Sequence, residues 1–241
     1  MTTTITSPDG VAELYPLLRR LTGDEKHSPS AYSTLDVLWT LYDRVLRVDP
    51  ATIDAPDRDR FLLSKGHGPA AYYAVLAAKG FIAPDWLDDL AGRDSRLGHH
   101  PDRTLVPGVE IGSGSLGHGL GLAVGTALGL RAQGLHDTAR VFVLLGDAEL
   151  DEGANHEAIA YAGATGLSGL TAIVVDNDSA THGWRGGSGA RGSGIAERFT
   201  VNGWSAAVVD GRDHDVLAGA LNARADGRPR VVVAVVEPKE G

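Results

Sequence analysis

The stretch Gly146–Ser179, GDAELDEGANHEAIAYAGATGLSGLTAIVVDNDS, places side chains that can do chemistry at two predicted strand ends. Asp147 follows the apolar run VFVLL, and Asn177 follows the run LTAIVV. Short, continuous apolar runs of this kind are typical of buried strands. Adjacent parallel strands end on the same edge of a sheet, where open α/β sheets bind ligands, so we expect Asp147 and Asn177 to approach each other.

These two side chains, with a nearby backbone carbonyl, would form a site built from hard oxygen ligands. Mg²⁺ favours such sparse ligation and completes its shell with phosphate oxygens and water. A helix is expected to start near Gly153, and a helix N-terminus favours a diphosphate group beside it. The competing interpretation is an acidic turn followed by a capped helix.

The surrounding pattern predicts the elements that position this site. The apolar runs predict strands at 141–145, 170–176 and 231–236, with a fourth candidate at 205–210. Helical spacing predicts helices at 35–46 (capped by Ser33 or Thr34), 69–79, 116–133, 155–165 and 213–225. Strands that alternate with helices predict an α/β fold with a doubly wound, mostly parallel sheet and helices on both faces.

Composition excludes several classes of protein. The chain has 241 residues, a formal net charge of −9 and no cysteine. The acidic balance argues against a nucleic-acid surface, and the lack of cysteine excludes disulfides and thiolate metal sites. Neither an apolar run long enough to span a membrane nor a secretory signal is visible, so we expect a cytoplasmic protein. A single domain over 1–241 is expected, with residues 1–10 flexible and Trp184–Gly194 a mobile loop.

The pair Asp147 and Asn177 also carries a family resemblance. A GDG-type motif followed about thirty residues later by Asn resembles the thiamine diphosphate signature of the transketolase family. The resemblance implies that thiamine diphosphate binds with Mg²⁺, or with Ca²⁺ or Mn²⁺ in its place. It implies that the metal ligands are Asp147, Asn177 and the carbonyl of Ser179. The cofactor-binding residues that it implies here are Gly146, Asp147, Ala148, Glu149 and Asn177, and Ala148 stands where the family usually has glycine.

Three further segments are similar to the family in the same order along the chain. Arg60–Gly68, RFLLSKGHG, maps His67 next to the cofactor, and HSPSAYSTLD maps His27 more faintly. Gly98–Gly121 resembles a second family motif. The resemblance implies catalytic roles for His27, His67 and His100, and cofactor contacts for His67, Gly114, Leu116 and His118.

The run Gly112–Gly117 is formally G-x-G-x-x-G, which in another context indicates a dinucleotide site. Here it follows VPGVEI, which is short and punctuated by proline, rather than a strong strand. Its glycines are better explained by close packing against a cofactor and a neighbouring helix.

The resemblance covers only the diphosphate-binding half of a transketolase. It therefore implies a separate partner chain that carries the pyrimidine domain and the activating glutamate, with self-association across a two-fold axis into a heterotetramer. The implied activity is transfer of a two-carbon ketol unit from a ketose or its phosphate to an aldose or a specialised acceptor. Two alternatives stay open: a component of a 2-oxoacid dehydrogenase of the E1 type, and a non-catalytic, degenerate partner subunit.

Overall fold

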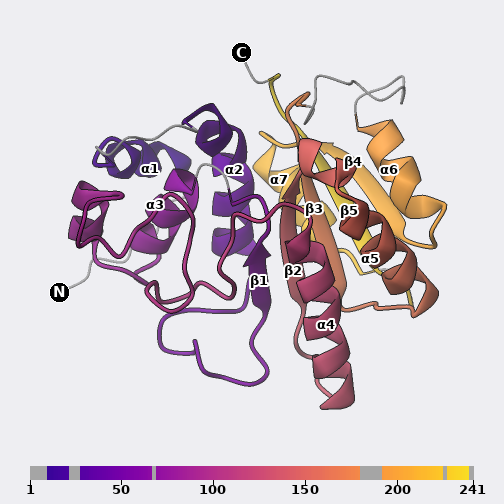
Figure 1. The fold of residues 1–241 in the computed structure, drawn as a ribbon. Helices are drawn as coiled ribbons and strands as arrows, with labels where there is room; N and C mark the ends of the chain where they lie inside the picture. The colour runs from indigo at the N-terminus through magenta and orange to yellow at the C-terminus, as the bar shows by residue number, and fades with distance from the viewer. Residues whose placement is uncertain (1–9, 22–27, 67–68, 180–191, 225–226, 239–241) are drawn as a thin grey trace.

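Five parallel strands form the centre of the molecule. The computed structural model describes residues 10–21, 28–66, 69–179, 192–224 and 227–238, without the side chains of 28–30. The strands are β1 (Arg60–Leu63), β2 (Val141–Gly146), β3 (Leu170–Asp176), β4 (Ser205–Asp210) and β5 (Arg230–Val235). Their order across the sheet is β1-β2-β3-β5-β4, and every pair is parallel (Figure 1).

The apolar runs form the central strands because both faces of the sheet are covered. Every residue of β2 and β3 is buried. Successive side chains of a strand point to opposite faces. Phe142 and Leu144 accordingly join one hydrophobic cluster, whereas Val141 and Val143 join another. This division confirms the predicted doubly wound architecture.

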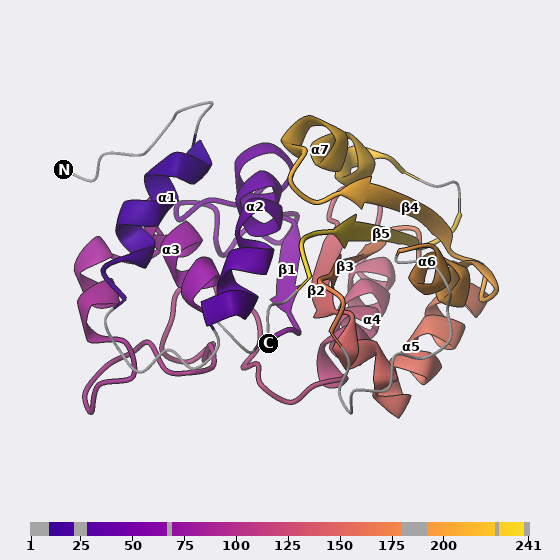
Figure 2. The ribbon, with the colours of Figure 1, turned by 90° about the horizontal axis from the view of Figure 1, so that it is seen from above.

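The helices are divided between these two clusters. On one face lie α1 (Gly10–Leu18), α2 (Ser28–Arg44), α3 (Ala70–Ala78) and α7 (His214–Asn222). On the other lie α4 (His118–Ala132), α5 (Gly153–Ala164) and α6 (Ser193–Thr200). Figure 2 shows the two groups on opposite sides of the sheet. Short 3-10 helices occupy Pro84–Asp89 and Ala148–Asp151.

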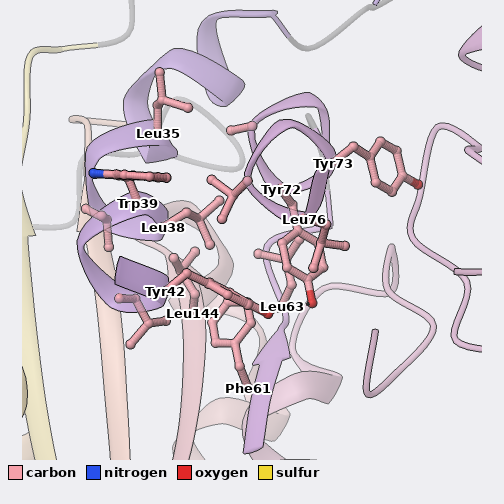
Figure 3. Close-up of a cluster of buried hydrophobic side chains, with 14 of the residues drawn as sticks. Leu35, Leu38, Trp39, Tyr42, Phe61, Leu63, Tyr72, Tyr73, Leu76 and Leu144 are labelled. Carbon is pink, nitrogen blue, oxygen red and sulfur yellow. Dashed lines mark hydrogen bonds between the residues drawn. The ribbon is translucent and has the colours of Figure 1, made fainter. Parts of the chain in front are cut away.

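Helix α2 packs against the sheet through an aromatic-rich cluster (Figure 3). Its side chains Leu35, Leu38, Trp39 and Tyr42 are buried at helical spacing. The Tyr42 ring meets Phe61 of β1 edge to face, with 5.6 Å between ring centroids. These contacts hold the start of α2 above the carboxyl ends of the strands, where Ser33 reaches the site described below.

The predicted bounds of α2 were wrong at its start. The helix begins at Ser28 rather than at residue 35, so Ser33 and Thr34 lie inside it and do not cap it. Pro29 is compatible with this start, because proline is favoured in the first turn, where its missing N–H is not needed. Ser33 and Thr34 are buried polar residues, which disguised the helical pattern. The Ser33 hydroxyl has tertiary partners, whereas the Thr34 hydroxyl donates to the Ala31 carbonyl oxygen at 3.0 Å, within the helix.

The prediction lacked β1, α1, α6 and both 3-10 helices. Gly10 belongs to α1 and is buried, whereas the expected flexible residues 1–9 lie outside the described residues. Residues 184–191 of the expected loop also lie outside them, and α6 already begins at Ser193. None of the described helices is both long and apolar enough to cross a membrane.

Candidate functional site

Asp147, Asn177 and Ser179 meet at the carboxyl edge of the sheet, beyond β2 and β3. The Asp147 carboxylate accepts hydrogen bonds from the Ala148 N–H at 2.9 Å and from the Ser179 N–H at 2.7 Å. The Ser179 hydroxyl donates to Asn177 Oδ1 at 2.6 Å. Ser179 therefore contacts both of the side chains that the sequence pairs, through its own N–H and hydroxyl.

The tight turn between Asn177 and Ser179 depends on Asp178. Its φ is +58°, in the left-handed region that aspartate tolerates better than most residues. The Asp178 N–H donates to the Asp176 carboxylate at 3.2 Å. This turn folds Ser179 back over Asp147 instead of letting β3 continue.

The donors at this site fit a hard divalent cation. A carboxylate, a carboxamide oxygen and a serine oxygen are ligands that Mg²⁺ accepts, and Mg²⁺ needs few protein ligands. Burial raises the pKa of Asp147 to about 6, although the two backbone N–H groups and the charge of Lys65 act in the opposite direction. A bound cation would favour the ionised carboxylate. Among the described residues, no cluster of three or more His, Cys, Asp or Glu side chains offers another metal site.

Ser33 and Lys65 lie beside Asn177, on the side away from Ser179. Asn177 Nδ2 donates to Ser33 Oγ at 3.2 Å, and Lys65 Nζ donates to the same oxygen at 3.1 Å. All three side chains are buried. The amide of Asn177 thus has an acceptor for its N–H group while its oxygen faces Ser179 and the candidate metal position.

Glu149 joins the separate segments of the site through its buried carboxylate. It accepts hydrogen bonds from the Ser64 hydroxyl, from the Gly117 N–H at 3.0 Å and from the Gly146 N–H at 3.3 Å. Burial raises its pKa, and these three donors oppose that effect. Glu149 therefore connects the ends of β1 and β2 with the loop that precedes α4. Its carboxylate holds these segments together.

His100 lies against Gly114, which in turn packs on Gly66. Gly114 has φ +118°, and a Cβ there would lie 2.7 Å from His100 Cδ2. A Cβ on Gly66 would lie 2.5 Å from the Gly114 nitrogen. The glycines therefore allow the end of β1 and the His100 loop to touch, which brings His100 to the same edge as Asp147.

The remaining predicted residues divide into two groups. His118 is exposed at the start of α4, and its Nδ1 lies 3.3 Å from the Ser115 carbonyl oxygen. Leu116 is partly buried two residues earlier. His27 and His67 lie outside the described residues, so their predicted roles stay predictions.

The backbone conformation is informative at two further places, Ala148 and the glycine run 112–117. Ala148 does not have the positive φ that would require glycine, so its backbone tolerates the methyl group. The segment 101–112 before the glycine run contains no strand, which removes the context of a dinucleotide fingerprint.

Sequence reasoning missed Lys65, Ser33 and Ser64 as parts of the site. Lys65 and Ser64 stand in the segment RFLLSKGHG, where only His67 was predicted as a site residue. A lysine two residues after the short apolar run FLL was the available signal. Ser33 could not be assigned from the sequence, because its contact with Asn177 spans 144 positions.

The fold and the site define an α/β protein whose candidate ligand site lies at the carboxyl edge of a parallel sheet. Residues 22–236 match the family model of the transketolase thiamine diphosphate-binding domain. The chain therefore belongs to the transketolase family, in the part that binds thiamine diphosphate, and the resemblance seen in the sequence is confirmed.

Known relatives differ in how much of their length this chain spans. A protein named Ferredoxin fas2 from Rhodococcoides fascians is 55% identical over 93% of this chain and 71% of its own length. An apulose-4-phosphate transketolase subunit from Actinobacillus succinogenes is 42% identical over 61% of this chain and 52% of its own. The 6-deoxy-6-sulfo-D-fructose transketolase subunit SqwG of a Clostridium species is 33% identical, over 90% and 81%.

Solved structures agree with these relatives. The transketolase from Leishmania mexicana superposes with a TM-score of 0.72 and 25% identity, covering 96% of this chain and 37% of that one. The chain thus spans little more than a third of that transketolase.

The name of the relative from Rhodococcoides fascians does not describe this chain. The sequence of this chain has no cysteine, so it lacks the thiolates that hold iron–sulfur clusters in ferredoxins.

Proposed function

We propose that this chain is the diphosphate-binding subunit of a two-subunit transketolase that depends on thiamine diphosphate and Mg²⁺. The observation that carries the proposal is the meeting of Asp147, Asn177 and Ser179 at one sheet edge, within the matched family region. The reaction proposed is transfer of a two-carbon ketol unit from a ketose or ketose phosphate to an aldose or a specialised acceptor. A cytoplasmic location is part of the proposal.

In this proposal the residues of the chain bind and orient the cofactor. Thiamine diphosphate would supply the carbanion chemistry for cleaving the carbon–carbon bond next to the ketose carbonyl. Asp147 and Asn177 ligate the metal, and the carbonyl of Ser179 completes the protein ligands. His100, with His27 and His67, donates to hydroxyl and carbonyl oxygens of the sugar and exchanges protons near neutral pH. Gly114, Leu116 and His118 line the cofactor.

A partner chain with the pyrimidine domain and the activating glutamate is proposed to complete the active site. Two relatives are named as transketolase subunits, which supports a divided enzyme. The surface of α4 and α5 also supports association, because Leu122 and Tyr161 are about half exposed. A Cβ at Gly121, Gly125 or Gly129 would meet no other atom within 4 Å. This face suits close packing against another chain, either a second copy or the partner subunit.

Calorimetric titration of thiamine diphosphate with Mg²⁺ tests the binding part of the proposal. The chain is titrated alone and with the pyrimidine-binding subunit from the same genome. Binding that EDTA and Asn177→Ala abolish supports the site. A mixture with the partner that binds no cofactor would support a degenerate subunit.

Turnover with the partner tests the reaction. Ketol transfer from a panel of ketoses and ketose phosphates to aldoses is the expected result. Release of CO₂ from pyruvate without ketol transfer would replace the proposal with 2-oxoacid chemistry.

A further inference from the structure

Lys65 is a buried cation whose role does not follow from the proposed metal ligands. Only 8% of the residue is exposed, and lysine is rarely buried to this degree unless charged or polar groups surround it. Its aliphatic stem passes over Gly146, where a Cβ would lie 3.5 Å from Lys65 Cγ, Cδ and Cε. That distance is ordinary van der Waals contact, so the stem of Lys65 runs along the end of β2 toward the site.

The ammonium of Lys65 is held next to the candidate metal ligands. Its Nζ and Asn177 Nδ2 donate to the same oxygen, Ser33 Oγ, at 3.1 and 3.2 Å. Both lone pairs of that hydroxyl are thereby used. The positive charge also acts on Asp147 and Glu149, since it lowers the pKa of each.

The negative charges at the site would exceed the positive charge of one Mg²⁺ once a diphosphate is bound, so a further cation is needed to balance them. Asp147, Glu149 and Asp176 already bring three carboxylates to this region, and a diphosphate adds several negative charges. One Mg²⁺ offsets two of them. A buried excess of negative charge is costly, and a lysine ammonium is a compact charge that suits phosphate oxygens.

We propose that Lys65 is a cofactor-binding residue, whose ammonium donates to the diphosphate while Ser33 holds it beside Asn177. This assignment rests on the proposed function. Ser33 is a positioning residue in it: Ser33 accepts from the Asn177 amide, so that the Asn177 oxygen stays turned toward the metal. The alternative is that Lys65 only balances the charges of Asp147 and Glu149 and does not touch the ligand.

Titrations of the full chain with its partner subunit distinguish the two roles. Inorganic diphosphate and thiamine diphosphate, each with saturating Mg²⁺, are the ligands. Lys65→Met keeps most of the stem over Gly146 and removes the charge. Lys79→Met is the matched control, because Lys79 is a partly buried lysine whose ammonium pairs with Asp43 and lies over the Trp39 ring.

Lys65→Met should weaken both ligands by about 10- to 100-fold, as expected for one hydrogen bond to a charged group. It should also reduce the salt dependence of binding, whereas Lys79→Met should bind as the wild type does. Ser33→Ala should raise the dissociation constant for Mn²⁺, measured with cofactor present, by about 10- to 100-fold. Ser33→Ala also tests the assignment if Lys65→Met does not fold. This substitution removes the oxygen that holds the Lys65 ammonium, so the affinity for inorganic diphosphate should fall about tenfold.

Wild-type binding that Lys65→Met leaves within twofold would overturn the assignment and leave the proposed function intact. Ser33→Ala with unchanged affinity for both metal and diphosphate would overturn it equally. A wild-type complex that binds neither ligand would overturn the proposed function, and this assignment with it.

Discussion

Replacing Gly114 with alanine should separate the geometry of His100 from the stability of the fold. Gly114 has φ +118°, where a residue with a side chain is strained by about 1–3 kcal/mol. The new Cβ would also lie 2.7 Å from Cδ2 and 2.9 Å from Cγ of His100. His100 is exposed, so its ring can move away and relieve that contact. The strain should remain, and the imidazole should be displaced.

We therefore expect Gly114→Ala to lower the free energy of unfolding by about 1–3 kcal/mol. Ketol transfer should fall about 100-fold, because a displacement of about 1 Å can cost that much in rate. Urea unfolding measures the first effect, and initial rates with the partner subunit measure the second. The loss in kcat/KM should exceed any loss in cofactor affinity, since the metal ligands are untouched.

Gly219→Ala is the control for this experiment. Gly219 lies inside α7, has no positive φ, and a Cβ there would meet no atom within 4 Å. Alanine should stabilise the helix by about 0.5–1 kcal/mol and leave turnover unchanged. If Gly114→Ala matched this control in both stability and rate, the packing of His100 on Gly114 would have no role in the site.

Three further predictions follow from buried acids. Because burial raises the pKa of Asp147 to about 6, its contribution to the stability of the metal-free chain should be complete below pH 3.8 and lost as the pH rises through 6. Urea unfolding in EDTA should show this about 3 kcal/mol dependence, and Asp147→Asn should remove it. Asp59→Asn should cost about 3–5 kcal/mol, because buried Asp59 pairs with Arg47 and Arg140. Burial alone would raise the Asp59 pKa, but these arginines hold it below its usual value, so this stability should be present above pH 3.8 and lost on acidification; an unchanged denaturation midpoint at pH 7 would contradict it. Glu149→Gln should cost about 1–3 kcal/mol in urea and weaken cofactor binding, because an amide N–H₂ would face backbone N–H donors; wild-type values for both would show that the carboxylate does not hold the loop.

The sequence by itself determined the central strands and the pairing of the main candidate ligands. Both faces of β2 and β3 are buried, so each strand is a nearly continuous apolar run. Polar residues mark where each run ends. Asp147 and Asn177 follow those ends directly, and parallel strands bring their ends together. Local order along the chain was therefore enough to predict that they meet.

Only the tertiary structure decided which other side chains join them. β1 has four residues and its apolar signal is short, so its end at Ser64 and Lys65 was not predicted as a strand end. Ser33 lies in a helix whose start looked like a cap, and its partner is 144 positions away. Hydrogen bonds between such distant residues leave no periodic trace in the sequence. They form because the packing of α2 and the sheet brings the groups within reach.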